Sequence, residues 1–209
     1  MAAVYVYALT DVPPDPWNDG RRRIESIPVE GIFAVCERRS ASPPISEAEL
    51  RRQHAIVQRI ADSAPATLPA RFGSLLDEAE LVRMIRNRRD VVLAALDHVR
   101  GHVQMTVRIA VEESKAVTPS ESGRAYLEAR QRRASPPVPP RARTALETVA
   151  PWVADERRTG SVARLLTVYQ LVGREHVSRY TAAIAAAGVK GMRVTGPWPP
   201  FAFVPDLWA

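Results

Sequence analysis

The sequence predicts an α+β fold made of two small domains with mainly antiparallel sheets. Helical and strand-like hydrophobic patterns alternate along the chain, which fits small ferredoxin-like or related packings. Gly101 ends a helical pattern directly before the clearest strand pattern, so we expect domains at residues 1–100 and 101–209. The strands are few and the glycines do not lie at strand–helix junctions, which disfavours a doubly wound parallel sheet.

The first domain is expected to open with a strand and a proline-rich loop. Residues 4–9 are β-branched and aromatic, and residues 29–36 predict a second, largely buried strand. Ser46 and Glu49 form a capping box, which predicts a helix that ends near Asp62.

A short extended segment at residues 67–73 follows, before Asp77 and Glu80 repeat the N-terminal helix signal. One longer helix is expected from there to Gly101, because apolar residues recur at helical spacing. They are Leu81, Ile85, Val92, Leu96 and Val99.

The second domain begins with residues 103–111, where apolar and polar residues alternate as in a strand with one dry face and one wetter face. The elements expected after it are a helix at 122–133, a proline-rich loop at 135–140, a helix at 141–153, a central strand at 162–172, a helix at 174–187 and a strand at 192–195.

Residues 196–203 read Gly-Pro-Trp-Pro-Pro-Phe-Ala-Phe. The prolines fix φ and push their preceding residues toward extended geometry, which predicts a stiff ribbon with Trp198, Phe201 and Phe203 at fixed spacing. Aromatic side chains ordered in advance lose little entropy when they pack. They could pack against their own domain or against a partner, and the sequence leaves both readings open.

Composition indicates an ordinary globular protein: 46% of the 209 residues are hydrophobic and 25% are charged. No apolar run approaches the roughly 18 residues that a membrane span requires, and no basic region precedes an apolar stretch at the N-terminus. The single Cys36 excludes an intramolecular disulfide and suits a reducing compartment. We therefore expect a cytoplasmic protein with no membrane partner.

The net charge of +6 comes almost entirely from arginine, since Lys115 and Lys190 are the only lysines. Arginine suits carboxylate pairs, aromatic stacking and phosphate recognition, although a GC-rich coding sequence would also produce this bias. The basic clusters are scattered among acids, so nucleic acid is not the expected partner. A basic RNA-binding α+β module is kept as the alternative function.

No residue set for catalysis or for a cofactor stands out, and no phosphate-binding or dinucleotide motif occurs. Cys36 lies in an apolar strand and reads as a buried structural thiol. His98 and His102 are four residues apart, but Gly101 lies between them and no further ligand completes a metal site. Adjacent carboxylates such as Asp155 and Glu156 diverge and make poor acid/base pairs. We expect no enzyme, and an enzyme of unknown reaction is the second alternative.

Several segments together resemble, in order, the landmarks of the gas vesicle accessory proteins of the GvpL/GvpF family. The last of them is the most specific, although Phe201 stands where many relatives carry tyrosine. The segments are Tyr5-Val6-Tyr7-Ala8, Leu68-Pro69-Ala70-Arg71-Phe72-Gly73, the strand that starts at Gly101, Ser122-Gly123-Arg124-Ala125-Tyr126-Leu127 and Gly196-Pro197-Trp198-Pro199-Pro200.

The resemblance implies a non-enzymatic accessory protein that is needed to build gas vesicles, with a modified ferredoxin-like unit as its second domain. It also implies binding to the small hydrophobic shell subunit (GvpA-type), and to other gas vesicle accessory proteins, by a chain that is monomeric when free and gas vesicle associated. A shell that excludes water requires subunits with a large apolar face, which aggregates unless a partner covers it. No cofactor is implied.

Two groups of residues are candidates for contacting that partner. Trp198, Phe201 and Phe203 would be aromatic anchors, and Arg71 with Phe72 would form a second patch. The alternative for the second patch is a strand end where Phe72 joins the core and Arg71 pairs with a carboxylate. The alternative for the ribbon is that it locks the sheet of the second domain.

Overall fold

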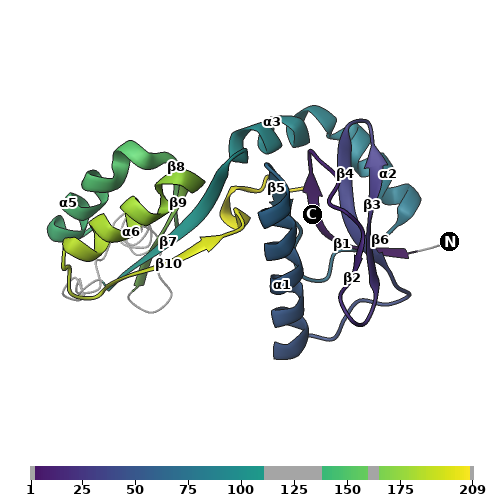
Figure 1. Cartoon of the computed structure of the whole chain (residues 1–209), viewed down its shortest axis with the longest axis horizontal. Helices are drawn as coiled ribbons and strands as arrows, with labels where there is room; N and C mark the ends of the chain where they lie inside the picture. The colour runs from purple at the N-terminus through teal and green to yellow at the C-terminus, as the bar shows by residue number, and fades with distance from the viewer. Residues whose placement is uncertain (1–2, 111–137, 160–164, 208–209) are drawn as a thin grey trace, which may run out of the picture. The chain divides into compact units, whose positions relative to one another are not determined.

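The computed structural model describes residues 3–110, 138–159 and 165–207. The chain combines helices with antiparallel sheets, as the predicted α+β class requires (Figure 1). Its contacts divide it into unit 1, Met1–His102 with Trp198–Ala209, and unit 2, Val103–Pro197. The boundary expected at residue 100 stays a prediction, and the division by contacts also assigns the C-terminal segment to unit 1. The predicted helix at 122–133 lies outside the described residues.

The sheet of unit 1 has the strand order β2-β3-β4-β1-β5, and β6 also pairs with β1. Strand β1 confirms the predicted first strand, and its residues from Val4 to Thr10 are at most 1% exposed. The strands are β1 Ala3–Thr10, β2 Trp17–Asn18, β3 Arg23–Val29, β4 Ile32–Arg38, β5 Thr67–Pro69 and β6 Leu75–Asp77.

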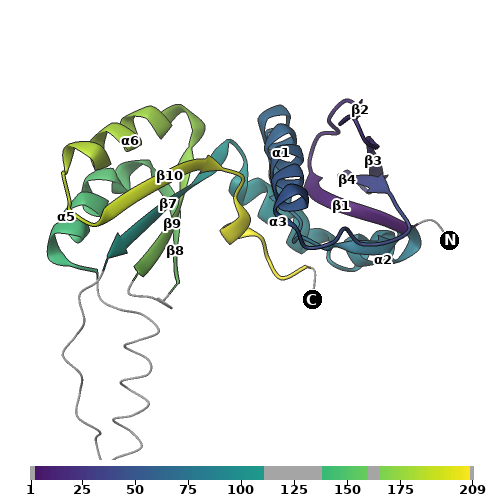
Figure 2. The ribbon, with the colours of Figure 1, turned by 90° about the horizontal axis from the view of Figure 1, so that it is seen from below.

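The described residues of this unit include three α-helices: α1 Glu47–Ser63, α2 Glu78–Asn87 and α3 Arg89–Val99. The predicted N-cap is present, since Ser46 Oγ accepts the Glu49 N–H at 3.3 Å. The single long helix predicted after Asp77 is wrong, because the backbone leaves helical geometry at Arg88 (φ −118°, ψ 19°). Helix α1 lies on one side of β1 and α2 on the other (Figure 2), which explains why both faces of β1 are buried.

The second predicted strand, at residues 29–36, begins too early. Val29 ends β3 and pairs with Ile32 at the start of β4. Between them Glu30 and Gly31 have φ of 48° and 86°. Two consecutive positive φ values are typical of the tight hairpin turns that match strand twist, so this stretch is a hairpin and not one strand.

Unit 2 contains, among its described residues, a sheet of order β10-β7-β9-β8. Helices α5 and α6 lie together on one face of it (Figure 1). The modified ferredoxin-like arrangement stays a prediction, which this order of elements favours. The elements are β7 His102–Ala110, α5 Pro140–Val149, β8 Val153–Thr159, β9 Leu165–Gly173, α6 Val177–Ala186 and β10 Met192–Trp198.

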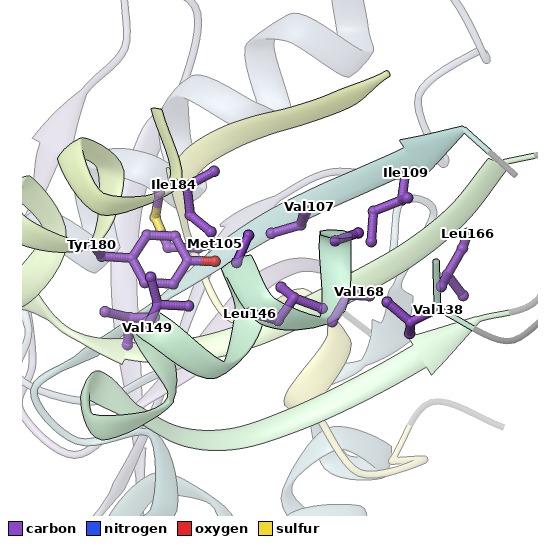
Figure 3. Packing of buried hydrophobic residues seen from close by; sticks show 13 residues of the cluster. Met105, Val107, Ile109, Val138, Leu146, Val149, Leu166, Val168, Tyr180 and Ile184 are labelled. Atoms are coloured by element: carbon purple, nitrogen blue, oxygen red, sulfur yellow. The ribbon is translucent and has the colours of Figure 1, made fainter. Parts of the chain in front are cut away.

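The core of unit 2 lies between this sheet and its two helices (Figure 3). Strand β7 supplies every second side chain to it, which confirms the predicted dry face. The expected wetter face is polar yet partly buried, because Gln104 and Thr106 are each 5% exposed. The labelled core residues are Met105, Val107, Ile109, Val138, Leu146, Val149, Leu166, Val168, Tyr180 and Ile184.

The helix predicted at 141–153 is too long. Helix α5 ends at Val149, a 3₁₀ turn at Ala150–Trp152 contains Pro151, and β8 begins at Val153. Strand β8 pairs with β9 and forms one edge of the sheet. Its charged residues suit an edge strand, where charge discourages pairing with other chains.

The predicted ribbon is extended only in its first half. Strand β10 continues to Trp198, and Gly196 has φ of +130° and a cis bond to Pro197. A Cβ on Gly196 would lie 2.8 Å from the Gln104 carbonyl oxygen, so β10 can approach β7 here only because the residue is glycine. The expectation is wrong after Pro200, where Phe201–Phe203 form a 3₁₀ turn, η3.

Candidate functional site

The three candidate aromatic residues have different surroundings within unit 1. The ring of Trp198 meets His54 of α1 edge-on at 5.3 Å between centroids. Phe201 is 42% exposed, whereas Phe203 is 2% exposed with its ring centroid 6.5 Å from that of His98. The turn η3 therefore has one buried anchor and one exposed aromatic side chain.

The segment that follows β5 is fixed by hydrogen bonds that its backbone N–H groups donate to residues of β1. The Ala70 N–H donates to the Tyr7 carbonyl at 2.8 Å, and the Gly73 N–H donates to the Tyr5 hydroxyl at 3.0 Å. The ring of Phe72 packs edge-on against Tyr5 at 6.5 Å. Two of the sequence landmarks, the opening strand and the segment after β5, are therefore held together.

Arg71 and the C-terminal segment meet in unit 1, although they lie far apart in the sequence. Arg71 Nη2 is 3.0 Å from Asp206 Oδ1, and the two side chains are 68% and 65% exposed. Arg88 donates a second hydrogen bond, to the Asp206 carbonyl. Pairing of Arg71 with a carboxylate is one of the two arrangements that the sequence left open.

A pocket of about 410 Å³ lies beside this contact. Arg71 and Glu80 provide its charged groups, and Leu207, which is 3% exposed, is one of its lining residues. Its apolar lining consists of Phe72, Leu75, Leu76, Met84 and Leu207.

Sequence reasoning missed a buried ionic network under β1. Glu37 has a fully buried side chain, and Arg52 of α1 and Arg39 both pair with its carboxylate. Arg52 also binds Asp19 at 2.6 Å through Nε and donates to the Tyr7 hydroxyl at 2.9 Å. Two signals in the sequence pointed to this network. Arg52 lies next to the apolar stripe of its helix, and Glu37 lies within an apolar strand.

The environment of this network shifts the pKa of its members. Burial raises the pKa of the Tyr7 hydroxyl well above its usual range. Burial alone would raise the pKa of Asp19, but hydrogen bonds from the Arg22 N–H and from Arg52 outweigh it and lower that pKa. Each charge in the network thus has a partner, as buried charges require.

Cys36, His98 and His102 each have defined surroundings in the structure. Cys36 is fully buried, and burial raises the pKa of its thiol to about 12. His102 Nδ1 lies 2.6 Å from the Arg100 carbonyl oxygen, and His98 lies against Phe203. Within residues 3–110, 138–159 and 165–207, no group of three or more His, Cys, Asp or Glu side chains could hold a metal ion.

The adjacent carboxylates Asp155 and Glu156 have different hydrogen-bond partners. Glu156 accepts hydrogen bonds from Arg158 at 2.6 Å and from Gln170 at 2.8 Å, whereas Asp155 accepts the Glu156 N–H at 2.7 Å. Each carboxylate therefore has a structural partner of its own.

In the part of the chain that the structure describes, no helix has both the length and the apolar character needed to cross a bilayer.

Two solved structures are similar to the fold across almost its whole length. One is the gas vesicle protein GvpF from Anabaena sp. PCC7120, with a TM-score of 0.73, 10% identity, and 98% of this chain and 99% of that chain covered. The other is the gas vesicle protein GvpF from Microcystis aeruginosa, with a TM-score of 0.71, 13% identity, and 97% and 99% covered. At these identities the likeness shows the fold.

No curated protein matched the sequence. The family model described as "Gas vesicle synthesis protein GvpL/GvpF" matches residues 3–205, which include the opening strand, the segment after β5 and the Gly196–Pro197 ending. The resemblance noted in the sequence is confirmed, and the chain belongs to the GvpL/GvpF family of gas vesicle proteins.

Proposed function

We propose that this protein is a non-enzymatic, chaperone-like assembly factor that binds the hydrophobic GvpA-type shell subunit and assists vesicle nucleation or assembly in the cytoplasm. The observation that carries the proposal is the family match over residues 3–205. A subunit whose apolar face will exclude water needs that face covered until it joins the shell. A folded protein that holds aromatic side chains at its surface can cover such a face.

The contact surface in this proposal comprises Trp198 and Phe201, with Arg71 and Phe72 as a second patch. Phe201 has the greatest exposure of the aromatic candidates, and its neighbour Phe203 is buried and holds the turn in place. Phe203 therefore positions the surface rather than touching the partner. An aromatic side chain that is already ordered loses little entropy on binding.

The test is co-purification of the shell subunit with the tagged full chain after co-expression, under conditions that keep the subunit soluble. Phe201→Ala and Trp198→Ala should each reduce the recovered subunit, while thermal unfolding changes little for Phe201→Ala. Leu165→Ala is the matched control, because Leu165 is 43% exposed and belongs to unit 2, whereas the proposed surface belongs to unit 1. Failure of the unchanged chain to retain the subunit would refute the proposal.

The RNA-binding alternative gains little support from the arginines. Several of them pair with carboxylates within unit 1, which leaves them less available to phosphates: Arg21 with Glu49 at 2.7 Å, Arg38 with Glu78 at 2.8 Å and Arg86 with Glu30 at 3.2 Å. A titration with generic RNA at increasing salt tests this directly, since phosphate binding weakens steeply with salt. We expect no salt-sensitive complex.

A further inference from the structure

The C-terminal segment is held in unit 1 by a pair of arginines that come from two separate parts of the chain. Arg71 follows β5 and contacts the Asp206 carboxylate at 3.0 Å. Arg88 lies at the junction of α2 and α3 and donates to the backbone carbonyl of the same residue. Arg71 thus pairs with the charged side chain of Asp206, and Arg88 donates a hydrogen bond to its main chain.

Leu207 adds an apolar contact next to the charged one. It is 3% exposed and lines the pocket of about 410 Å³ together with Phe72, Leu76 and Met84. Pockets of roughly 300 Å³ and above are large enough to bind ligand groups. Asp206 therefore meets an arginine, and Leu207 is part of the apolar wall of a pocket that is open.

We propose that this pocket docks a short segment of a partner protein that carries a carboxylate followed by a large aliphatic side chain. The chain's own Asp206 pairs with Arg71 in cis and competes with the partner's carboxylate. This ion pair is weak enough to be displaced, because both of its side chains are more than 60% exposed. Ion pairs with this exposure change an equilibrium constant by up to about fivefold.

The charges of the pocket favour a peptide over a polyanion. Glu80 lies in the lining together with Arg71, so a second negative charge close to the first would meet a carboxylate. The apolar residues Leu75, Leu76 and Met84 require an apolar group rather than phosphate or sugar. A single acidic residue beside an aliphatic one satisfies both conditions.

The test uses the ¹⁵N-labelled full chain and the blocked peptide Val-Pro-Asp-Leu, which has the sequence of residues 204–207. Backbone amide shifts in the chain should move at Leu75, Leu76 and Met84 as the peptide is added. Asp206→Ala should bind the peptide about fivefold more tightly than the unchanged chain, because the cis competitor has lost its carboxylate. Arg71→Ala introduced into that variant should remove the gain.

Two controls separate the site from general charge effects. Arg51→Ala removes an exposed arginine that pairs with Glu47 on α1 and should leave peptide binding unchanged. A peptide with asparagine in place of aspartate should bind the Asp206→Ala chain about fivefold more weakly than the original peptide.

Equal affinity of the unchanged chain and Asp206→Ala, or shifts confined to residues outside the pocket, would overturn the proposal. If Asp206→Ala does not fold, Asp206→Asn keeps the side-chain shape and removes the charge. The readout is a peptide and does not require the shell subunit. A failed co-purification would therefore leave this result standing, and a failed peptide titration would leave the proposed function standing.

Discussion

The Tyr5 hydroxyl accepts a hydrogen bond from the Gly73 N–H at 3.0 Å and donates one to Gln53 Oε1. One buried side chain of β1 thus joins the segment after β5 to helix α1. Gln53 completes the connection, because its amide donates to the Ala70 carbonyl at 3.3 Å. These hydrogen bonds fix the Ala70 carbonyl and the Gly73 N–H. Arg71 lies between these two groups in the chain, so its position depends on them.

Tyr5→Phe should lower the free energy of unfolding by about 1–3 kcal/mol, because it leaves the Gly73 N–H and the Gln53 amide without their partner. Urea unfolding of the full chain measures this. Tyr169→Phe is the matched control on β9, where no hydrogen bond of the hydroxyl is found within the described residues, and it should change stability by less than about 0.5 kcal/mol. Equal effects of the two substitutions would contradict the role assigned to Tyr5.

Asp19→Asn should remove a pH-dependent part of the stability. The pKa of Asp19 is lowered in the folded chain, so its contribution is fully present above the unfolded pKa of about 3.9 and is lost as the pH falls through the lower folded pKa. The variant should therefore be less stable than the unchanged chain at pH 7, and the difference should shrink at the acidic end of the series.

The measurement is urea unfolding at a series of pH values from 7 downward. Asp90→Asn provides the control, because the Asp90 side chain is 97% exposed and lies 3.6 Å from Arg89. A constant difference between Asp19→Asn and the unchanged chain over the whole series would show that Asp19 does not titrate in this way.

Gly196→Ala should destabilise unit 2 by about 1–3 kcal/mol, because the added Cβ would approach the Gln104 carbonyl to 2.8 Å and Met105 Sδ to 2.9 Å. Gly20→Ala is an informative control. Gly20 also has a positive φ, +89°, but no atom lies within 4 Å of the position that an added Cβ would take, so this substitution reports backbone strain alone. Chemical denaturation measures the free energy of unfolding of both variants. A larger loss of stability for Gly196→Ala than for Gly20→Ala would be due to the close approach of β10 to β7.

Cys36 should not react with a thiol reagent such as DTNB at pH 8 while the chain is folded. Burial raises the pKa of its thiol to about 12, and its side chain is inaccessible. In denaturant one thiol per chain should react at once. Rapid labelling of the native chain would mean that β4 opens readily.

The sequence predicted elements where local signals and hydrophobic periodicity agreed. The N-cap at Ser46, the alternation along β7 and the apolar run of β1 each have a local physical cause. The hairpin turn at Glu30 and Gly31 also has a local cause, positive φ, but a glutamate in that conformation is uncommon. The charged strand β8 could not be foreseen, because its conformation depends on pairing with β9.

The candidate site was harder to predict than the fold. The identity of Arg71 indicated a carboxylate partner, but nothing local pointed to Asp206, which lies 135 positions away. The ribbon's prolines predicted its extended half, whereas the turn at Phe201–Phe203 closes through a hydrogen bond from the Phe203 N–H to the Pro200 carbonyl at 3.0 Å. Contacts of this kind arise from the assembled unit and not from residue preferences.

The division of the chain also has a consequence for its synthesis. Unit 2 is one continuous stretch, Val103–Pro197, while unit 1 needs Trp198–Ala209 in addition to its first 102 residues. On the ribosome, the described residues of unit 2 have all been made before the residues that bring Phe203 and Leu207 into unit 1. The unit whose synthesis begins first is therefore completed only after unit 2 has been made.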